Sequence, residues 1–333
     1  MSAPGTGPLA ALVAGSGQNP DLSRLLLEFQ GTSTETQLKA LQERWKLPSP
    51  IPDAVWQSLS SMLDKTVAYA PPARELVAEV VRHLIDAKNI TQGVGTDSCT
   101  VTTLQQKLAE VNPRAYVRIV SGLFQNGSVQ VRLDRKLDLK PEDFADRSDR
   151  RGPVSDAMQN ALMRLARTFP ENALPFPMTS GFFQDPGGAS FGMKGLLARA
   201  ASFGGLNRIA SRGAAAGDVG SGLTANQFVE VYRSILGGRP EFVSSGFQVP
   251  QVPNEFFESL SRPQNQSFGR GVTSFLKPED GATVGHAVRL LGVRDGMALL
   301  HDPARFGSFG VPKYELPVED FLKKCEGVIL NPS

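Results

Sequence analysis

Cys99 is the residue of this chain whose type and position best suit nucleophilic chemistry. It follows a glycine-containing loop, residues 93–97, and opens a segment in which apolar residues recur at helical spacing. At the first turn of a helix, free backbone N–H groups and the helix dipole stabilise both a thiolate and an oxyanion. The alternative is a buried structural cysteine, because cysteine is common in protein cores.

A nucleophilic cysteine also needs a base and a group that orients this base, and His286 and Asp302 are the candidates. A histidine in a β-rich apolar run is more often a core residue. Here, however, Gly285 leaves one side of the imidazole open, and the run leads through turn residues 294–296 to a strand that ends at Asp302. A three-residue turn places Asp302 diagonally across from His286 on one face, whereas a two-residue turn places it on the other face. The sequence leaves this register open.

The third requirement is a donor for the oxyanion. Gln92 lies seven residues before Cys99 and carries a suitable side-chain N–H donor; the alternative is an ordinary polar residue of a loop. The other two histidines and the second cysteine are predicted to be structural, namely His83, His301 and Cys325.

Taken in order, these residues resemble the papain-like cysteine peptidase superfamily in its broad sense. Gln92, a glycine-containing loop and Cys99 at a helix start are similar to calpain-type enzymes. The sequence Gly-His-Ala-Val at 285–288, followed by a turn and Asp302-Pro303, is similar to the bacterial double-glycine leader peptidases. Residues 98–123 and 150–166 also resemble bacterial secreted or effector-type papain-like domains.

The resemblance covers residues 92–133 and 268–330, about a third of the chain. Two positions depart from the family pattern. Gln92 lies one residue further from the cysteine than is usual, and Thr100 stands where many members have an aromatic residue or a glycine.

By this resemblance, Cys99 is the nucleophile, His286 the general base and acid, Asp302 the orienting residue and Gln92 the oxyanion donor. The implied fold is papain-like, with the cysteine on a helix that packs on an antiparallel sheet bearing the histidine and the aspartate. The implied activity is that of a hydrolase, foremost a cysteine peptidase (a thiol protease), which acts on a protein or peptide substrate through an acyl-enzyme and without a cofactor. The alternatives are an inactive papain-like binding module, or a secreted effector that uses the same triad for deamidation, transglutamination or acyl transfer.

The elements that must position these residues predict an α+β fold. Residues 1–20 are rich in small residues and predict a flexible N-terminus, residues 21–89 predict a helical module, and residues 90–333 predict the catalytic domain with an irregular, glycine-rich insertion at about 170–222. Helices are expected over 99–111 and 155–168, and strands within 268–330. Residues 116–133 contain β-rich runs around Asn126-Gly127, of which the first also fits a helix. Thr34 and Gln37 predict a capping box.

Charge and composition exclude several classes of function. The 35 basic and 33 acidic residues leave a net charge of +2, which gives no field to hold nucleic acid. No apolar run reaches the roughly 18 residues that a membrane helix needs, so no membrane insertion is expected. The N-terminus has no basic segment before its short apolar stretch, which predicts a cytoplasmic protein or one exported without a cleavable signal peptide. Two distant cysteines and three scattered histidines predict no metal site.

Overall fold

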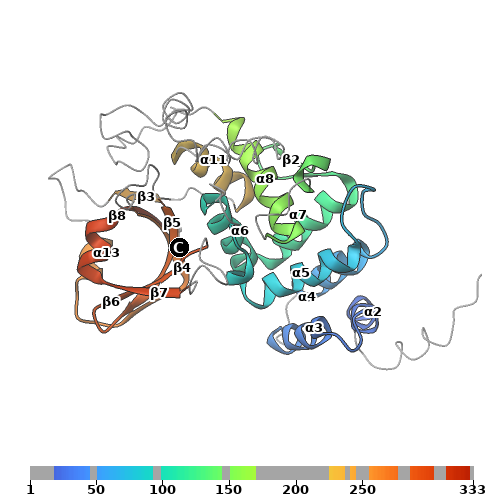
Figure 1. Cartoon of the computed structure of the whole chain (residues 1–333), viewed down its shortest axis with the longest axis horizontal. Coiled ribbons are helices and arrows are strands. Elements are labelled where there is room, and N and C mark those ends of the chain that lie inside the picture. The colour runs from blue at the N-terminus through green and yellow to red at the C-terminus, as the bar shows by residue number, and fades with distance from the viewer. Residues whose placement is uncertain are drawn as a thin grey trace, which may run out of the picture.

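The computed structural model describes residues 19–45, 51–92, 99–144, 151–169, 225–236, 241–244, 255–276, 286–303 and 313–330. The insertion predicted at 170–222 and all but the last two residues of the predicted N-terminal segment lie outside this part of the chain. Within it, the fold combines a helical part with an antiparallel sheet, as the sequence predicts for the α+β class (Figure 1).

The helical part forms from amphipathic segments whose apolar faces meet. In α5, for example, Leu76, Val77, Val80 and Leu84 recur at helical spacing and are all buried. Each such side chain contributes about 1.5–3 kcal/mol on burial. The helices of this part are α2 (Pro20–Glu28), α3 (Ser33–Arg44), α4 (Ile51–Met62), α5 (Ala73–Ile85), α6 (Cys99–Val111), α7 (Pro113–Asn126), α8 (Pro153–Arg167) and α11 (Ala225–Ile235), with short 3-10 helices η1 (Ala87–Asn89) and η2 (Pro141–Phe144).

Helix α7 settles the open assignment of the first run, residues 116–120, in favour of a helix, whereas residues 128–130 of the second run form a strand, as predicted. Asn112 caps the N-terminus of α7 by accepting a hydrogen bond from Ala115, and Pro113 occupies the first turn, where no N–H is needed. Gly127 ends the helix in the left-handed conformation, with φ of 71°. The Asn-Gly pair therefore closes a helix instead of turning a hairpin, because a left-handed glycine serves both purposes.

The capping box predicted at Thr34 and Gln37 is wrong by two residues. Thr32 is the N-cap of α3 and accepts from the backbone N–H of Glu35, while the Glu35 carboxylate accepts from Gly31. Thr34 is instead buried within the helix. Both threonines have an acidic or amide residue three positions later, so the sequence pattern alone fits either start.

The sheet has six strands in the order β3-β8-β4-β5-β6-β7, and each strand is antiparallel to its neighbours. Figure 1 shows it strongly curved, with α13 on the side away from α6. Residues 128–130 and 136–138 form a separate two-stranded ladder, β1 (Ser128–Gln130) with β2 (Lys136–Asp138). The elements of the sheet are β3 (Glu241–Ser244), β4 (Gln266–Leu276), β5 (His286–Arg294), β6 (Met297–His301), β7 (Lys313–Pro317) and β8 (Cys325–Leu330), accompanied by α12 (Glu255–Leu260) and α13 (Val318–Lys324).

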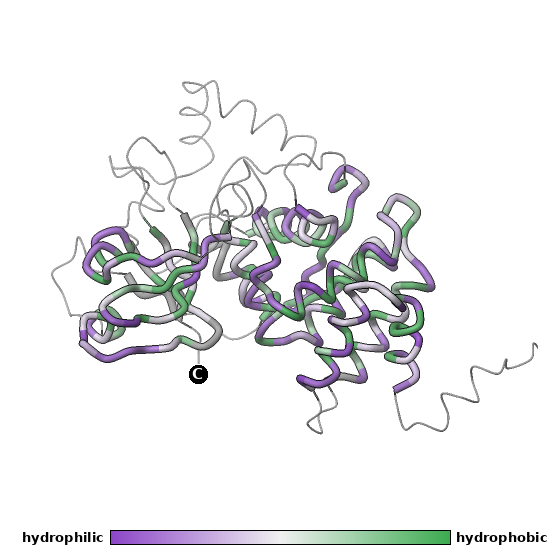
Figure 2. The backbone as a smooth tube through the Cα atoms, turned by 60° about the horizontal axis from the view of Figure 1, so that its bottom comes forward, coloured by the Kyte–Doolittle hydropathy of each residue, from purple (hydrophilic) through white to green (hydrophobic). Residues whose placement is uncertain are grey.

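Two hydrophobic clusters form the core of the described chain. The first joins all the helices from α2 to α11, and the second joins the sheet with α12 and α13. Figure 2 shows the hydrophobic residues recurring along both the helices and the strands. The boundary predicted at residue 89 falls inside the first cluster, because helices on both sides of it share that core. In the described residues, no helix is both long and apolar enough to cross a membrane.

Candidate active site

The hairpin of β5 and β6 sets the position of Asp302 relative to His286. Its turn has two residues, Asp295 and Gly296, with φ of 51° and 76°, and Arg294 pairs with Met297. Positive φ at both positions is the type I′ geometry that matches the twist of paired strands. A two-residue turn on its own predicts Asp302 on the face opposite His286.

A β-bulge reverses that outcome. The pairing shifts by one residue between Leu290 and Gly292, so that Arg289 lies opposite His301. Continued along the strands, this register sets Asp302 one diagonal step from the backbone of His286, as the three-residue alternative predicts. Gly292 permits the bulge, because a Cβ atom there would collide with the Gln266 carbonyl of β4.

Cys99 begins α6, as predicted, and is 8% exposed. It lies eleven residues before Glu110, which is three helical turns and leaves the two residues about 20° apart around the helix. The Glu110 carboxylate binds both terminal nitrogens of Arg289 on β5, at 3.0 Å for Nη1 to Oε1. The face of α6 that carries Cys99 is therefore the face that α6 turns towards the sheet.

Gln92 meets the end of the β5–β6 hairpin directly. Its backbone N–H donates to the carbonyl oxygen of Pro303 at 3.0 Å, and Pro303 follows Asp302. Gln92 and Asp302 are both buried, at 7% and 4% exposed. His286 is the first residue of β5 and pairs with Leu276 of β4, so it stands at this same end of the sheet.

The structure thus brings the segment of Gln92 and the segment of Asp302 together and places His286 and Cys99 on the two elements beside them. Residues 93–98 and the side chain of His286 lie outside the described part of the chain. The contact between thiol and imidazole therefore stays a prediction.

The remaining candidates are buried, each in a different setting. Cys325 belongs to the second hydrophobic cluster. His301 is 1% exposed and lies opposite Arg289 in the sheet; within the described chain, neither of its ring nitrogens has a hydrogen-bond partner. Burial, and then the nearby Arg289 guanidinium, lower the pKa of His301 to about 4, so its imidazole is neutral at physiological pH.

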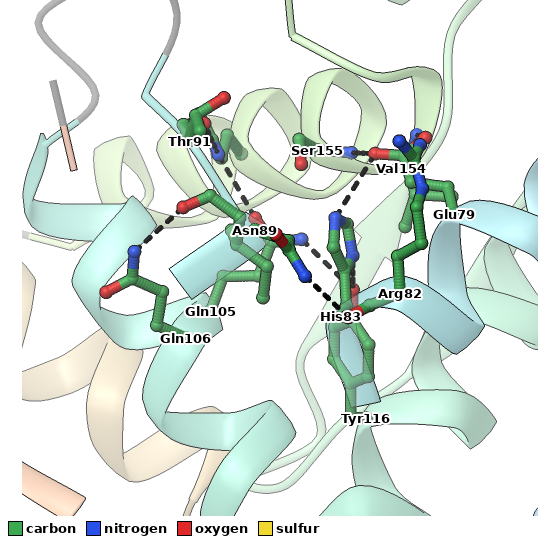
Figure 3. A network of polar contacts seen from close by, with 12 residues as sticks. Glu79, Arg82, His83, Asn89, Thr91, Gln105, Gln106, Tyr116, Val154 and Ser155 are labelled. Atoms are coloured by element: carbon green, nitrogen blue, oxygen red, sulfur yellow. Dashed lines mark hydrogen bonds and ion pairs between the residues drawn. The ribbon is translucent and has the colours of Figure 1, made fainter. Parts of the chain in front are cut away.

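A buried polar network in the helical part was not predicted from the sequence (Figure 3). It begins at two main-chain carbonyls just before Gln92. Gln106 of α6 donates to the carbonyl of Ile90 at 2.7 Å, and Gln159 of α8 donates to the carbonyl of Thr91 at 2.8 Å. Gln159 also donates to Gln105 at 3.2 Å.

From Gln105 the network continues across α7 to α5. Gln105 donates to the Tyr116 hydroxyl at 3.3 Å, and that hydroxyl lies 2.7 Å from Nδ1 of His83. In the tautomer that carries the His83 proton on Nε2, the Tyr116 hydroxyl donates to Nδ1. Nε2 lies 3.5 Å from Oε1 of Glu79. Glu79 in turn accepts from the backbone N–H groups of Val154 and Ser155 at 2.9 and 3.1 Å, which caps α8.

Burial sets the charges in this network. It lowers the pKa of His83 to about 3, with a further contribution from Arg82, so the imidazole is neutral. Burial also raises the pKa of Glu79, against the two backbone N–H groups that favour the charged carboxylate. The sequence carries a weak signal for the network: Glu79 and His83 stand four residues apart beside an apolar face, and two glutamines interrupt the apolar pattern of α6.

The described residues hold no cluster of three or more metal-binding side chains. Comparisons with protein-family models, with curated proteins and with solved structures find no significant match to this chain.

Proposed function

We propose that this protein is a papain-like cysteine hydrolase that cleaves peptide bonds, with Cys99 as the nucleophile. The observation that carries the proposal is the main-chain hydrogen bond from Gln92 to Pro303. It joins the segment that leads into Cys99 to the end of the hairpin that bears His286 and Asp302. Two segments that are far apart in the sequence, the one with Gln92 and the hairpin with His286 and Asp302, thereby meet at one end of the sheet, and Cys99 follows seven residues after Gln92.

In the proposed reaction, His286 takes the proton of the Cys99 thiol, and the thiolate attacks the carbonyl carbon of the scissile peptide. Gln92 donates its side-chain N–H to the oxyanion, together with the free backbone N–H groups at the start of α6. His286 then protonates the departing amine, which leaves an acyl-enzyme. Water, deprotonated by His286, releases the acid and restores the thiol. Asp302 orients the imidazole and stabilises its charged form.

Alkylation of Cys99 by iodoacetamide tests this proposal without any knowledge of the substrate. The rate is measured against pH by mass spectrometry in the wild type, in His286→Ala and in the matched control His301→Gln. Cys325, which is fully buried, is the internal reference. We expect rapid alkylation of Cys99 below pH 7 in the wild type and in His301→Gln, and loss of this advantage in His286→Ala.

Alkylation that follows an ordinary thiol, with half of its rise near pH 8.5, would refute the proposed thiolate–imidazolium pair. Equal behaviour of the two histidine variants would refute the role of His286. Peptide hydrolysis itself is measured with a pool of fluorogenic peptides, with Cys99→Ser as the inactive control.

A further inference from the structure

Three consecutive residues before the Cys99 loop are each held through the main chain by a different element. Gln106 of α6 binds the carbonyl of Ile90 at 2.7 Å, and Gln159 of α8 binds the carbonyl of Thr91 at 2.8 Å. The backbone N–H of Gln92 binds Pro303 at the end of β6, at 3.0 Å. The helices fix two of these residues, and the hairpin fixes the third.

Gln159 can serve this purpose because its own amide has only one workable orientation. Its Oε1 accepts from Nη1 of Arg151 at 3.2 Å, and a guanidinium can only donate. The carbonyl of Thr91 can only accept, so Nε2 of Gln159 must face it. Arg151 is held in turn by Asp156, at 2.7 Å from Nε to Oδ1. All of these side chains are at least nine-tenths buried, so water does not replace the lost bonds readily.

We infer that Gln159 is a positioning residue for Gln92: the amide of Gln159 fixes the Thr91 carbonyl, and thereby the orientation of the Gln92 side chain that the proposed function assigns to the oxyanion. This inference rests on the proposed function. Gln159 itself touches no reacting atom, and its effect passes through the peptide that joins Thr91 to Gln92.

The sharpest variant is Gln159→Glu, which keeps the shape of the side chain and its bond with Arg151 but removes the donor to Thr91 and to Gln105. Gln159→Met removes the same donor without adding a charge, together with the acceptor of Arg151, and it replaces the first variant if that one does not fold. The matched control is Gln125→Glu on α7, which loses one donated hydrogen bond, to Ser61, elsewhere in the helical part.

The first readout needs no activity. Hydrogen exchange of the Gln92 amide in the full chain reports whether the hydrogen bond to Pro303 stays closed. We expect exchange about tenfold faster or more in the Gln159 variants, and unchanged exchange in Gln125→Glu. Unchanged exchange at Gln92 in both Gln159 variants would overturn the inference.

The second readout separates positioning from a general loss of stability. Loss of a side-chain oxyanion donor lowers kcat by about 10²–10³, so we expect Gln92→Ala to fall in this range and the Gln159 variants to lose about tenfold or more, with little change in KM. Binding of a peptide aldehyde, which forms a tetrahedral adduct, weakens in parallel. The rate at which iodoacetamide alkylates Cys99 stays unchanged, because this reaction forms no oxyanion.

The double variant Gln92→Ala with Gln159→Met is expected to match Gln92→Ala alone, since the two residues act through one group. Additive losses would overturn the inference. If Cys99 of the wild type shows no enhanced reactivity, the proposed function is refuted. If hydrogen exchange at Gln92 is unchanged in the Gln159 variants, only the positioning role is refuted, so the two failures are distinguishable.

Discussion

The ion pair between Glu110 of α6 and Arg289 of β5 joins the helical part to the sheet, and its removal gives the most direct test of the architecture. The Arg289 side chain is 2% exposed and that of Glu110 is 23% exposed. Glu110→Ala leaves a guanidinium buried without its carboxylate. Removing one partner of such a buried pair costs about 3–5 kcal/mol of the free energy of unfolding.

The structure also predicts an asymmetry between the partners. Arg289→Met fills much of the same volume with an apolar chain and leaves Glu110, which water can reach, so we expect a loss below about 2 kcal/mol. The variant with both substitutions is expected to be more stable than Glu110→Ala alone, because the buried guanidinium that lost the Glu110 carboxylate is gone.

Urea denaturation measures these differences, and the surface pair of Arg24 and Asp64 is the control. These side chains are 45% and 60% exposed, so Asp64→Ala is expected to cost no more than about 1 kcal/mol. A loss in Glu110→Ala as small as that of Asp64→Ala would refute the claim that this pair is buried and joins the two parts.

Three further outcomes follow from single side chains. The pKa of His301 falls from 6.5 to about 4 on folding, so the unfolded chain binds more protons between these pH values. The protein therefore loses stability as the pH falls through this range, by about 3 kcal/mol once the pH is below it. A pH series of urea midpoints measures this loss in the wild type, and His301→Leu is expected to lack it. Gly152→Ala is expected to lower the thermal midpoint and to cost about 1–3 kcal/mol, because a Cβ atom there overlaps the Glu79 carboxylate that caps α8; an unchanged melting curve would contradict that placement. Gly292→Ala is expected to destabilise the bulge of β5, because the added Cβ atom collides with the Gln266 carbonyl. Hydrogen exchange should then be faster in β5 and β6 and unchanged in α2 and α3, which serve as the reference.

The sequence predicted the elements that short-range patterns determine. Helices α6 and α8 have strong apolar periodicity, and their spans lie within two residues of the prediction. The segment of α7 was left open because Val, Ile and Tyr favour strands on an exposed pleated surface but also pack well on a buried helix face. Burial against α4 and α6 decides in favour of the helix, and that burial depends on contacts far along the chain.

The position of Asp302 in the candidate site likewise depends on contacts that the local sequence does not reveal. The sequence fits a two-residue and a three-residue turn, and each turn length on its own predicts one position of Asp302. The protein combines a two-residue turn with a bulge between Leu290 and Gly292. The bulge shifts the register by one residue and so restores the position of Asp302 that a three-residue turn predicts. A glycine in a strand is a known sign of a bulge or of close backbone approach, but it does not tell which strand neighbour requires it.

The Gln159 network was missed for a different reason. Each of its glutamines reads as a polar residue on the outer face of a helix, where most glutamines lie. They are buried because α6 and α8 are covered on nearly all sides, and this coverage is a property of the assembled core. Their partners are main-chain carbonyls of residues 90 and 91, which carry no sequence signature at all.

Helix α6 belongs to the first hydrophobic cluster, and its side towards the sheet is met by polar groups. Thr273, Arg289 and His301 form one row across β4, β5 and β6, and all three are buried. An apolar contact tolerates sliding, whereas the bidentate bond between Arg289 and Glu110 holds α6 at one position along β5. Cys99 stands about 16 Å along the helix from Glu110. The bond between Gln92 and Pro303 joins the segment that leads into Cys99 to the end of the sheet. The position of Cys99 relative to the end of the β5–β6 hairpin therefore depends on both of these contacts.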